Sequence, residues 1–143
     1  MKNIIKLVNK KAAINIELKG RDTTKALANI LQHFVNEGWA KEKFLVSSVS
    51  WSELVDFVEV NPGVLTGVIV GKNPFGVLIK AKQIKAHSIH IPKQYLKIRK
   101  GLIKRLKDQG FKMFVFTLNE PADIALAKEL GLDGIFSDYP DRL

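Results

Sequence analysis

The strongest constraint on the fold is a regular alternation of strand-like and helix-like segments along all 143 residues. Strand-like segments are short apolar runs bounded by Gly, Pro or polar residues, whereas helix-like segments repeat apolar residues every three to four positions. Strands are expected over 13–19, 44–49, 64–70, 88–91, 111–118 and 134–137. Alternation of this kind is typical of a parallel sheet covered by helices, either doubly wound or curved into a barrel.

Helix-like segments fill the intervals between these strands, and no linker, repeat or low-complexity tract interrupts them. The expected helices cover 3–11, 23–37, 74–85, 93–109 and 121–130, and one more follows Ser50. Asp22 or Thr23 is expected to cap the second helix and Ser50 the third, because short polar side chains accept hydrogen bonds from the first N–H groups of a helix. The apolar stripe expected on the first helix consists of Ile4, Ile5, Leu7 and Val8. The sequence predicts a single domain over 1–143.

Composition excludes several classes of site. The chain has no cysteine, so disulfides, thiolate catalysis and cysteine-based metal sites are all absent. No apolar run approaches the roughly 20 residues that a transmembrane helix needs. The first ten residues carry lysines within their apolar run and no small-residue cleavage site, which is a poor match to a signal peptide. We therefore expect a cytoplasmic protein without a transmembrane segment.

The net charge of +9 is concentrated in one region. Residues 72–112 contain twelve lysines or arginines and a single acid, Asp108. Such a region could attract nucleic acid, anionic lipid or phosphorylated ligands. Before the strand expected over 111–118, this region contains only two Phe, Tyr or Trp residues, Phe75 and Tyr95, that could stack on bases. No nucleic-acid motif is present either, so we expect no specific nucleic-acid partner. A solvated basic helix face is the simpler interpretation.

The first strand carries the most informative polar face. Asn15, Glu17 and Lys19 alternate with apolar residues, so they share one side of the strand. On a half-exposed edge strand this side would face solvent, and Glu17 and Lys19 would form a surface ion pair. In a sheet covered on both faces, the two charges would instead enter an enclosed site.

Polar residues also gather where the expected strands end, which is where barrel and doubly wound sheets place their sites. Glu17 is the strong candidate for a cation ligand, and Lys19 and Lys72 could hold a phosphate. His90 is the histidine best placed for acid–base chemistry, although a structural role fits it equally well. No phosphate-binding glycine loop, HExxH or GxSxG motif occurs. From the residues alone, the chain is a phosphate- or metal-binding α/β domain of unknown substrate.

Four runs in order along the chain carry a family resemblance. They are INIELK at 14–19, SSVS at 47–50, FTLN at 116–119 and GLDGIFSDYPD at 131–141. Their order and spacing resemble the glycerophosphodiester phosphodiesterase family. The resemblance implies an eight-stranded β/α barrel that uses a divalent cation, Mg²⁺ or Ca²⁺, to hydrolyse glycerophosphodiesters. It covers essentially the whole chain.

The resemblance also assigns roles to individual residues. It implies that Glu17 binds the metal and that Lys19 reaches the substrate phosphate. Phe116 stands where the family usually has a pocket-lining tryptophan. Asn119 and His90 are further candidates for substrate contact.

The sequence departs from the family pattern in one large respect. The family's His-Arg-Gly strand and its Glu-Asn-Thr, Glu-x-Asp and His-Asp segments, which supply both acid–base histidines and two metal carboxylates, have no counterpart here. The chain is therefore expected to match strands three to eight, as an incomplete TIM-type barrel of about six parallel β/α units, truncated at its N-terminal side. Weak cation binding and weak or absent activity of the isolated chain follow.

Two further expectations concern partners. Six strands of an eight-stranded barrel leave two unpaired edges, which predicts a homo-oligomer, most simply a dimer. The expected ligand is a glycerophosphodiester or another phosphorylated small molecule. The alternative is a non-catalytic module that binds phosphorylated ligands or anionic surfaces through residues 72–112.

Overall fold

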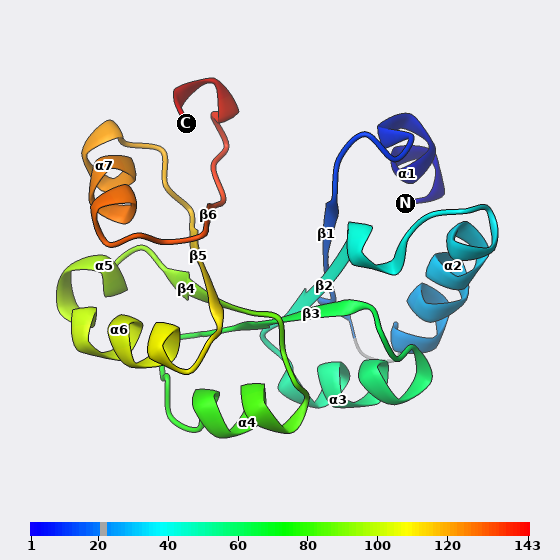
Figure 1. Ribbon diagram of the computed structural model, residues 1–143, viewed down its shortest axis with the longest axis horizontal. Helices are drawn as coiled ribbons and strands as arrows, with labels where there is room; N and C mark the ends of the chain where they lie inside the picture. The colour runs from blue at the N-terminus through cyan, green and yellow to red at the C-terminus, as the bar shows by residue number, and fades with distance from the viewer. Residues whose placement is uncertain (21–22) are drawn as a thin grey trace.

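The computed structural model describes residues 1–20 and 23–143, and its centre is one six-stranded sheet (Figure 1). All neighbouring strands are parallel, and their order in space is their order in the chain. The strands are β1 (Ile14–Glu17), β2 (Phe44–Ser48), β3 (Leu65–Ile69), β4 (Ser88–Pro92), β5 (Lys112–Phe116) and β6 (Gly134–Ile135). The predicted arrangement of six parallel β/α units is confirmed.

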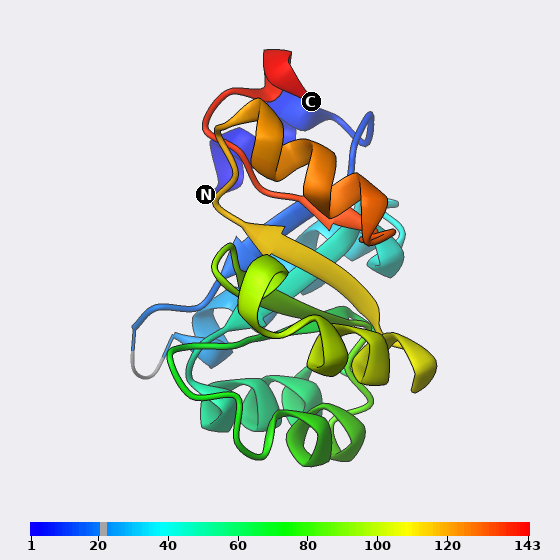
Figure 2. The same ribbon diagram turned by 90° about the vertical axis from the view of Figure 1, so that its left-hand side faces the viewer.

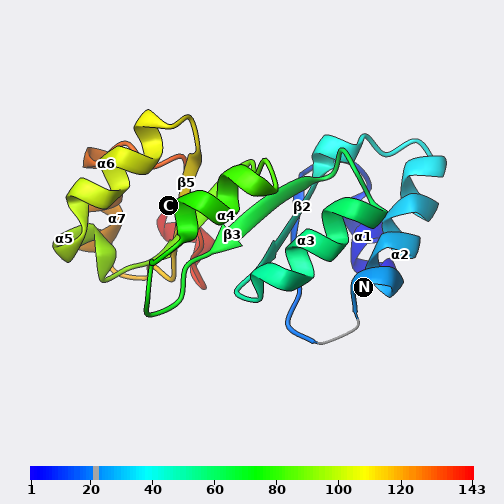
Figure 3. The same ribbon diagram turned by 90° about the horizontal axis from the view of Figure 1, so that it is seen from below.

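Helices connect the strands and cover the outer side of the curved sheet (Figures 1 and 3). The α-helices are α1 (Lys2–Val8), α2 (Thr24–Asn36), α3 (Trp51–Val60), α4 (Val77–Gln83), α5 (Tyr95–Ile98), α6 (Lys100–Asp108) and α7 (Pro121–Glu129). Two short 3-10 helices are η1 (Lys41–Lys43) and η2 (Pro140–Arg142). Figure 2 looks onto the end of the assembly formed by β5, α6 and α7.

The hydrophobic core lies between the sheet and the helices. Because side chains alternate along a strand, every second residue of each strand points to the helices. Val46, Val68, Ile89 and Val115 are completely buried on this side. Helices α2, α3 and α6 contribute their own buried apolar residues, including Leu31, Leu54, Phe57 and Leu106. This layer holds the strand ends in fixed positions.

The opposite, concave side of the sheet has a different composition. Strand pairing aligns Glu17 with Ser47 and Ser47 with Gly67, and the same register aligns His90 with Phe114. Small and polar residues therefore line the concave side of β1, β2 and β3 around Glu17, with Leu45 and Leu65 nearer the amino ends, and the rings of His90 and Phe114 line that of β4 and β5. The candidate site residues belong to this side.

The sheet does not close into a barrel. Within residues 1–20 and 23–143, β1 pairs only with β2 and β6 only with β5, so the outer edges of β1 and β6 remain unpaired. Figure 1 shows β1 and β6 as the two flanks of the opening, with both chain termini on the same side. The incomplete barrel expected from the sequence is confirmed.

Several element boundaries differ from the prediction. The basic helix expected over 93–109 is two helices, because Arg99 (φ −133°) leaves the helical region between α5 and α6. Helix α4 begins only at Val77, since Gly76 has a left-handed backbone (φ 78°). Pro92 does not stop β4 but is its last residue and pairs with Phe116. A proline lacks the N–H of a sheet ladder, and the end of a strand tolerates this loss.

The predicted helix caps are wrong in detail. Ser50 precedes α3 and Thr23 precedes α2, but neither side chain caps its helix. The Ser50 hydroxyl lies 3.1 Å from that of Ser52, and the Thr23 hydroxyl donates to the Gly20 carbonyl at 2.9 Å. Asp22 lies outside the described residues.

The apolar stripe predicted for the first helix is only partly buried. Ile5 is completely buried and Val8 packs against the core, whereas Ile4 and Leu7 are exposed. No helix in the described part of the chain has both the length and the apolar character needed to cross a bilayer.

Candidate substrate-binding site

Glu17 and Lys19 lie at the carboxyl end of β1. The backbone between them is fixed by β2: the Leu18 N–H donates to the Ser47 carbonyl, and the Ser48 hydroxyl donates to the Leu18 carbonyl, both at 2.8 Å. The Leu18 side chain is buried in the core, so its two neighbours project to the concave side. Lys19 Nζ lies 3.4 Å from Glu17 Oε2, and the two side chains are 76% and 34% exposed. The pair is therefore open to a ligand.

Ser47 lies beside Glu17 on the next strand and has an unusual hydroxyl. The residue is completely buried, and among the described residues nothing hydrogen-bonds to its Oγ. A buried polar atom without a partner costs about 1 to 3 kcal/mol. This oxygen is enclosed beside Glu17, and only a local opening of the site would expose it to a ligand atom.

His90 lies in the middle of the concave side and is 1% exposed. Its ring stacks on Phe114, with the centroids 5.1 Å apart, and is tilted against Phe136 at the same distance. Its Nε2 lies 2.8 Å from Ser88 Oγ. Burial, with a smaller contribution from nearby His87, lowers the pKa of His90 from 6.5 to about 4. The imidazole is therefore neutral at physiological pH and is held by internal contacts.

Asn119 joins the carboxyl ends of β5 and β6. Its side-chain oxygen accepts the Asp138 N–H at 3.1 Å and the Ser137 hydroxyl at 3.3 Å, and its amide donates to Asp138 Oδ2 at 2.9 Å. Its carbonyl accepts a hydrogen bond from Arg142 at 3.0 Å. Asn119 therefore orders the loop after β6, with its side-chain groups engaged within the protein. Phe116, the last residue of β5, is half-buried on the concave side.

The described residues do not fit a closed divalent-cation site. Mg²⁺ and Ca²⁺ take six or more oxygen ligands, several of them carboxylates. Near Glu17 the concave side offers the Asn15 amide and the Ser47 hydroxyl, and the Lys19 ammonium already contacts the carboxylate. In the part of the chain that the structure describes, no group of three or more His, Cys, Asp or Glu could hold a metal.

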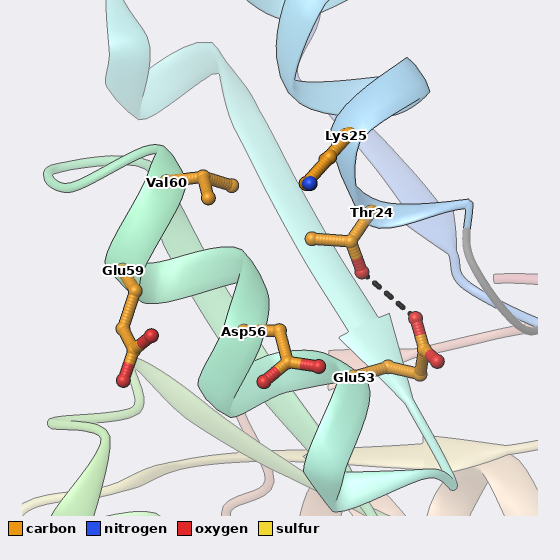
Figure 4. Close-up of a pocket in the computed structure, with 6 residues that line it drawn as sticks. All are labelled: Thr24, Lys25, Glu53, Asp56, Glu59 and Val60. Atoms are coloured by element: carbon orange, nitrogen blue, oxygen red, sulfur yellow. Dashed lines mark hydrogen bonds between the residues drawn. The ribbon is translucent and has the colours of Figure 1, made fainter.

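A second hollow lies on the outer side of the sheet, between α2 and α3 (Figure 4). It has a volume of about 420 Å³ and carries three carboxylates from α3: Glu53, Asp56 and Glu59. Glu53 accepts a hydrogen bond from the Thr24 hydroxyl at 2.8 Å, and Lys25 faces the same space. These groups are separated from Glu17 by the sheet, so they do not extend the concave site.

The concave side itself contains a hollow of about 370 Å³ near the amino ends of the strands. Residues from both unpaired edges line it, including Ile14 and Asn15 of β1 and Ile135 of β6, together with Phe114. The lining is mainly apolar. The interior of this half-barrel is therefore charged at one end and apolar at the other.

Comparison with known proteins identifies this arrangement. The profile of the Glycerophosphoryl diester phosphodiesterase family matches residues 1–142. The chain belongs to this family. The match covers almost all of the chain and confirms the resemblance inferred from its four runs.

Individual relatives agree with this assignment. The Bacillus subtilis (strain 168) protein YhdW, named for glycerophosphodiester phosphodiesterase activity, is 25% identical over 140 residues, which are 96% of this chain and 57% of YhdW. The glycerophosphodiester phosphodiesterase of Caldanaerobacter subterraneus subsp. tengcongensis is 26% identical over 131 residues, covering 91% of this chain and 53% of that protein. The glycerophosphodiester phosphodiesterase family member described here thus spans little more than half the length of these relatives.

Solved structures show the same fold. An Oleispira antarctica phosphodiesterase, in complex with the product sn-glycerol-3-phosphate, superposes with a TM-score of 0.85 and 21% identity. The alignment covers 99% of this chain and 58% of the Oleispira chain. The β/α units of this family member therefore follow the barrel architecture of that enzyme over part of its length.

The structure brings together some of the predicted site residues and separates others. Glu17 and Lys19 are in contact, as their spacing predicted, whereas His90 and Asn119 each have partners within the protein. Sequence reasoning did not single out Ser88 as the partner of His90. An alternating Ser-x-His strand was the available signal, because residues two apart share one side of a strand.

Proposed function

We propose that this chain binds the phosphate of glycerophosphodiesters, or of other phosphorylated small molecules, at the carboxyl end of β1. The observation that carries the proposal is the exposed Glu17–Lys19 pair on the concave side, in a chain that belongs to the glycerophosphoryl diester phosphodiesterase family. The glycerol phosphate bound by the Oleispira enzyme supports a ligand of this class. The reaction class is phosphoric diester hydrolysis in lipid metabolism.

Lys19 is proposed as the phosphate contact. Its ammonium is 76% exposed and lies 3.4 Å from Glu17, so it can swing to an incoming phosphate without leaving a buried charge unpaired. Among the described residues of β1 and β2, Glu17 remains beside it as the carboxylate available to a bridging cation. Phe116 is proposed to line the pocket, with Asn119 and His90 as further substrate contacts or as groups that position its wall.

Hydrolysis by these residues alone is proposed to be weak or absent. General acid–base catalysis needs a side chain that reaches the reacting oxygen in a titratable state near the working pH. His90 is neutral and bonded to Ser88, and His33 lies on α2 with its Nε2 3.4 Å from Glu37. His87 lines the hollow at the amino ends of the strands, which is the wrong end for contact with Lys19. The proton-transfer groups of the family pattern have no equivalents among these.

The experiment separates binding from catalysis. Calorimetric titration with glycerol 3-phosphate should show binding that Lys19→Ala weakens at least tenfold. Lys104→Ala is the matched control, because Lys104 is equally exposed and also pairs with a carboxylate. Wild-type affinity in Lys19→Ala would contradict the proposed phosphate site.

Turnover is measured in parallel on glycerophosphocholine and bis(p-nitrophenyl) phosphate with Mg²⁺ and with Ca²⁺. We expect none above the rate in buffer. Turnover that Glu17→Ala abolishes would show that the chain is a complete enzyme and would overturn the proposal of weak activity.

We also propose that the chain self-associates across its open side. The outer edges of β1 and β6 present unpaired backbone groups in the described structure, and unpaired strand edges readily pair with another chain. The mainly apolar hollow between these edges, lined by Leu45, Leu65 and Phe136 among others, would be covered by a second copy. A two-fold dimer is the simplest closed arrangement.

Two earlier expectations remain predictions. They are the cytoplasmic location and a binding role for the basic region 72–112.

A further inference from the structure

We propose that the outer surface of α4 and α6 docks on an anionic phospholipid bilayer. The observation is a pair of large apolar side chains in full contact with solvent within the most basic part of the chain. Phe75 is 86% exposed and Ile79 is 76% exposed. Phe75 lies in the loop just before α4 and Ile79 lies on the first turn of α4, and both side chains line the same groove.

The exposed pair lies opposite the buried face of α4. Val77 and Ala81 are 2% and 0% exposed and hold the helix against the core. Ile79 follows Val77 by two positions, or about 200° around the helix, so it points away from the core. Nothing in the described structure covers Phe75 or Ile79, although burial of such residues is strongly favourable.

A shallow groove of about 310 Å³ runs between α4 and α6, which lie side by side on the outer layer (Figure 3). Its walls include Phe75 and Ile79 from one side and Leu102 and Arg105 from the other. An apolar groove with a guanidinium at its rim suits an acyl chain or glycerol backbone below an anionic headgroup.

The surrounding charge is strongly and uniformly positive. Lys72 precedes Phe75 in the same loop, Lys82 lies three residues after Ile79, and Arg105 lines the groove. None of these three forms an ion pair with another residue that the structure describes. The single acid of the region, Asp108, is already paired with Lys104 at 2.9 Å. The positive potential of this surface is therefore not cancelled locally.

An anionic bilayer can bind both the basic side chains and the exposed apolar side chains of this surface. Anionic headgroups attract clustered lysines and arginines, and the interfacial zone beneath accepts aromatic and aliphatic side chains. A nucleic acid would neutralise the cations but would leave Ile79 without a partner, since bases are bound by stacking on aromatic rings. The combination of apolar anchors and basic rim thus favours lipid.

The position of Phe75 links this surface to the concave site. Phe75 lies in the loop between β3 and α4, at the carboxyl ends of the strands, which is also where Glu17 and Lys19 lie. Docking through this loop would hold the site near lipid headgroups. This link alone rests on the proposed function, whereas the docking itself does not.

Vesicle flotation tests the proposal on the full chain. Vesicles of phosphatidylcholine with phosphatidylglycerol should carry the protein, and vesicles of phosphatidylcholine alone should carry much less. Phe75→Ser with Ile79→Ser should lower the bound fraction at least tenfold, and Lys82→Glu with Arg105→Glu should do the same. Molar salt should weaken binding because it screens the attraction to headgroups.

The matched control is Lys6→Glu with Leu7→Ala on α1, where Leu7 is 84% exposed beside a lysine. This variant should bind vesicles as the wild type does. Circular dichroism should show unchanged folding for every variant, because all substituted side chains are outside the core.

Any one of three outcomes would overturn the proposal. Binding that survives loss of Phe75 and Ile79 but not charge reversal would indicate a purely electrostatic surface, as for a nucleic acid. Binding lost in the α1 variant and kept in the α4 variant would assign docking to the other end of the molecule. A Phe75→Trp variant adds an independent readout. Brominated anionic lipids should quench its fluorescence more than that of the wild type, and equal quenching of the two proteins would contradict insertion.

Discussion

Gly67 of β3 provides the space that the His90 ring of β4 occupies. A Cβ on Gly67 would lie 2.5 Å from His90 Nε2 and 2.9 Å from Ser88 Oγ. Both distances are shorter than a van der Waals contact, so no side chain fits there without moving the Ser88–His90 pair. The absence of a side chain at one position on β3 therefore permits the aromatic stack on the neighbouring strands.

Gly67→Ala is expected to destabilise the fold by about 1 to 3 kcal/mol, the usual cost of overpacking a filled site. Urea unfolding followed by circular dichroism measures this change. The control is Gly101→Ala on α6, where an added Cβ meets nothing within 4 Å. Alanine there should be neutral or stabilising by up to about 1 kcal/mol. Equal stability of the two variants would contradict the tight packing at Gly67.

The buried His90 predicts a loss of stability in mild acid. Its pKa is about 4 in the folded protein and 6.5 in an exposed chain. Above pH 6.5 neither state binds the proton; between pH 6.5 and 4 the unfolded chain binds it first, so the free energy of unfolding falls as the pH falls. The loss from this residue amounts to about 3 kcal/mol and is complete near pH 4.

His90→Gln removes this titration and should flatten the dependence between pH 6.5 and 4, whatever its effect on absolute stability. His33→Gln, at a half-exposed position beside Glu37, is the control for the histidine-to-glutamine substitution itself. Thermal unfolding across this pH range checks both. A dependence that persists in His90→Gln would show that another group causes it.

Asp133 is predicted to stabilise the start of β6. Burial raises its pKa, but hydrogen bonds from Lys112 and from the Met113 N–H, with the charges of Lys112 and Lys107, outweigh burial and leave the pKa below its usual value. Asp133→Ala leaves the Met113 N–H without its 2.9 Å partner and should cost about 1 to 3 kcal/mol.

Asp108→Ala is the matched control for Asp133. Asp108 also accepts from a lysine at 2.9 Å, but the pair is mostly exposed and binds no backbone group. Its removal should change stability by less than about 1 kcal/mol. Chemical denaturation should give a lower midpoint for Asp133→Ala than for Asp108→Ala. Equal midpoints for the two variants would refute the role of Asp133.

Divalent cations are predicted to bind the isolated chain weakly. Glu17 offers one carboxylate, and its neighbours add too few oxygens to replace the water shell of Mg²⁺ or Ca²⁺. Titration calorimetry should detect no tight site, and added Mg²⁺ should leave the melting temperature unchanged. A tight site abolished by Glu17→Gln would contradict this and would require ligands from outside the concave side of β1 and β2.

Self-association is predicted to depend on the outer edge of β1. In a parallel pair, alternate residues direct their backbone groups to opposite neighbours, and Leu18 directs its N–H to β2. The N–H of Asn15, three residues earlier, therefore points to the unpaired edge. Asn15→Pro should remove this donor and shift the protein to monomers in light scattering at constant protein concentration. A wild-type protein that is already monomeric at micromolar concentration would exclude the dimer.

The order of elements follows from the sequence because it depends on local patterns, whereas the incomplete barrel was expected from the family resemblance. The nearly continuous apolar run over 64–70 and the helical spacing over 23–37 are each set by neighbouring residues, and both elements are present. The contact between Glu17 and Lys19 was equally predictable, since residues two apart share a strand face.

The tertiary structure alone decided the rest of the site. The lowered pKa of His90 depends on burial against Phe114 and Phe136, and the unpaired Ser47 hydroxyl depends on its position between β1 and β3. The helix break at Arg99 was not predicted from the periodicity of the segment. The exposure of Phe75 was not predictable either, because a sequence pattern identifies an apolar residue but not what covers it. Strand register and packing join residues that are far apart in the chain, and for that reason the sequence determined the sheet while the three-dimensional contacts determined its chemistry.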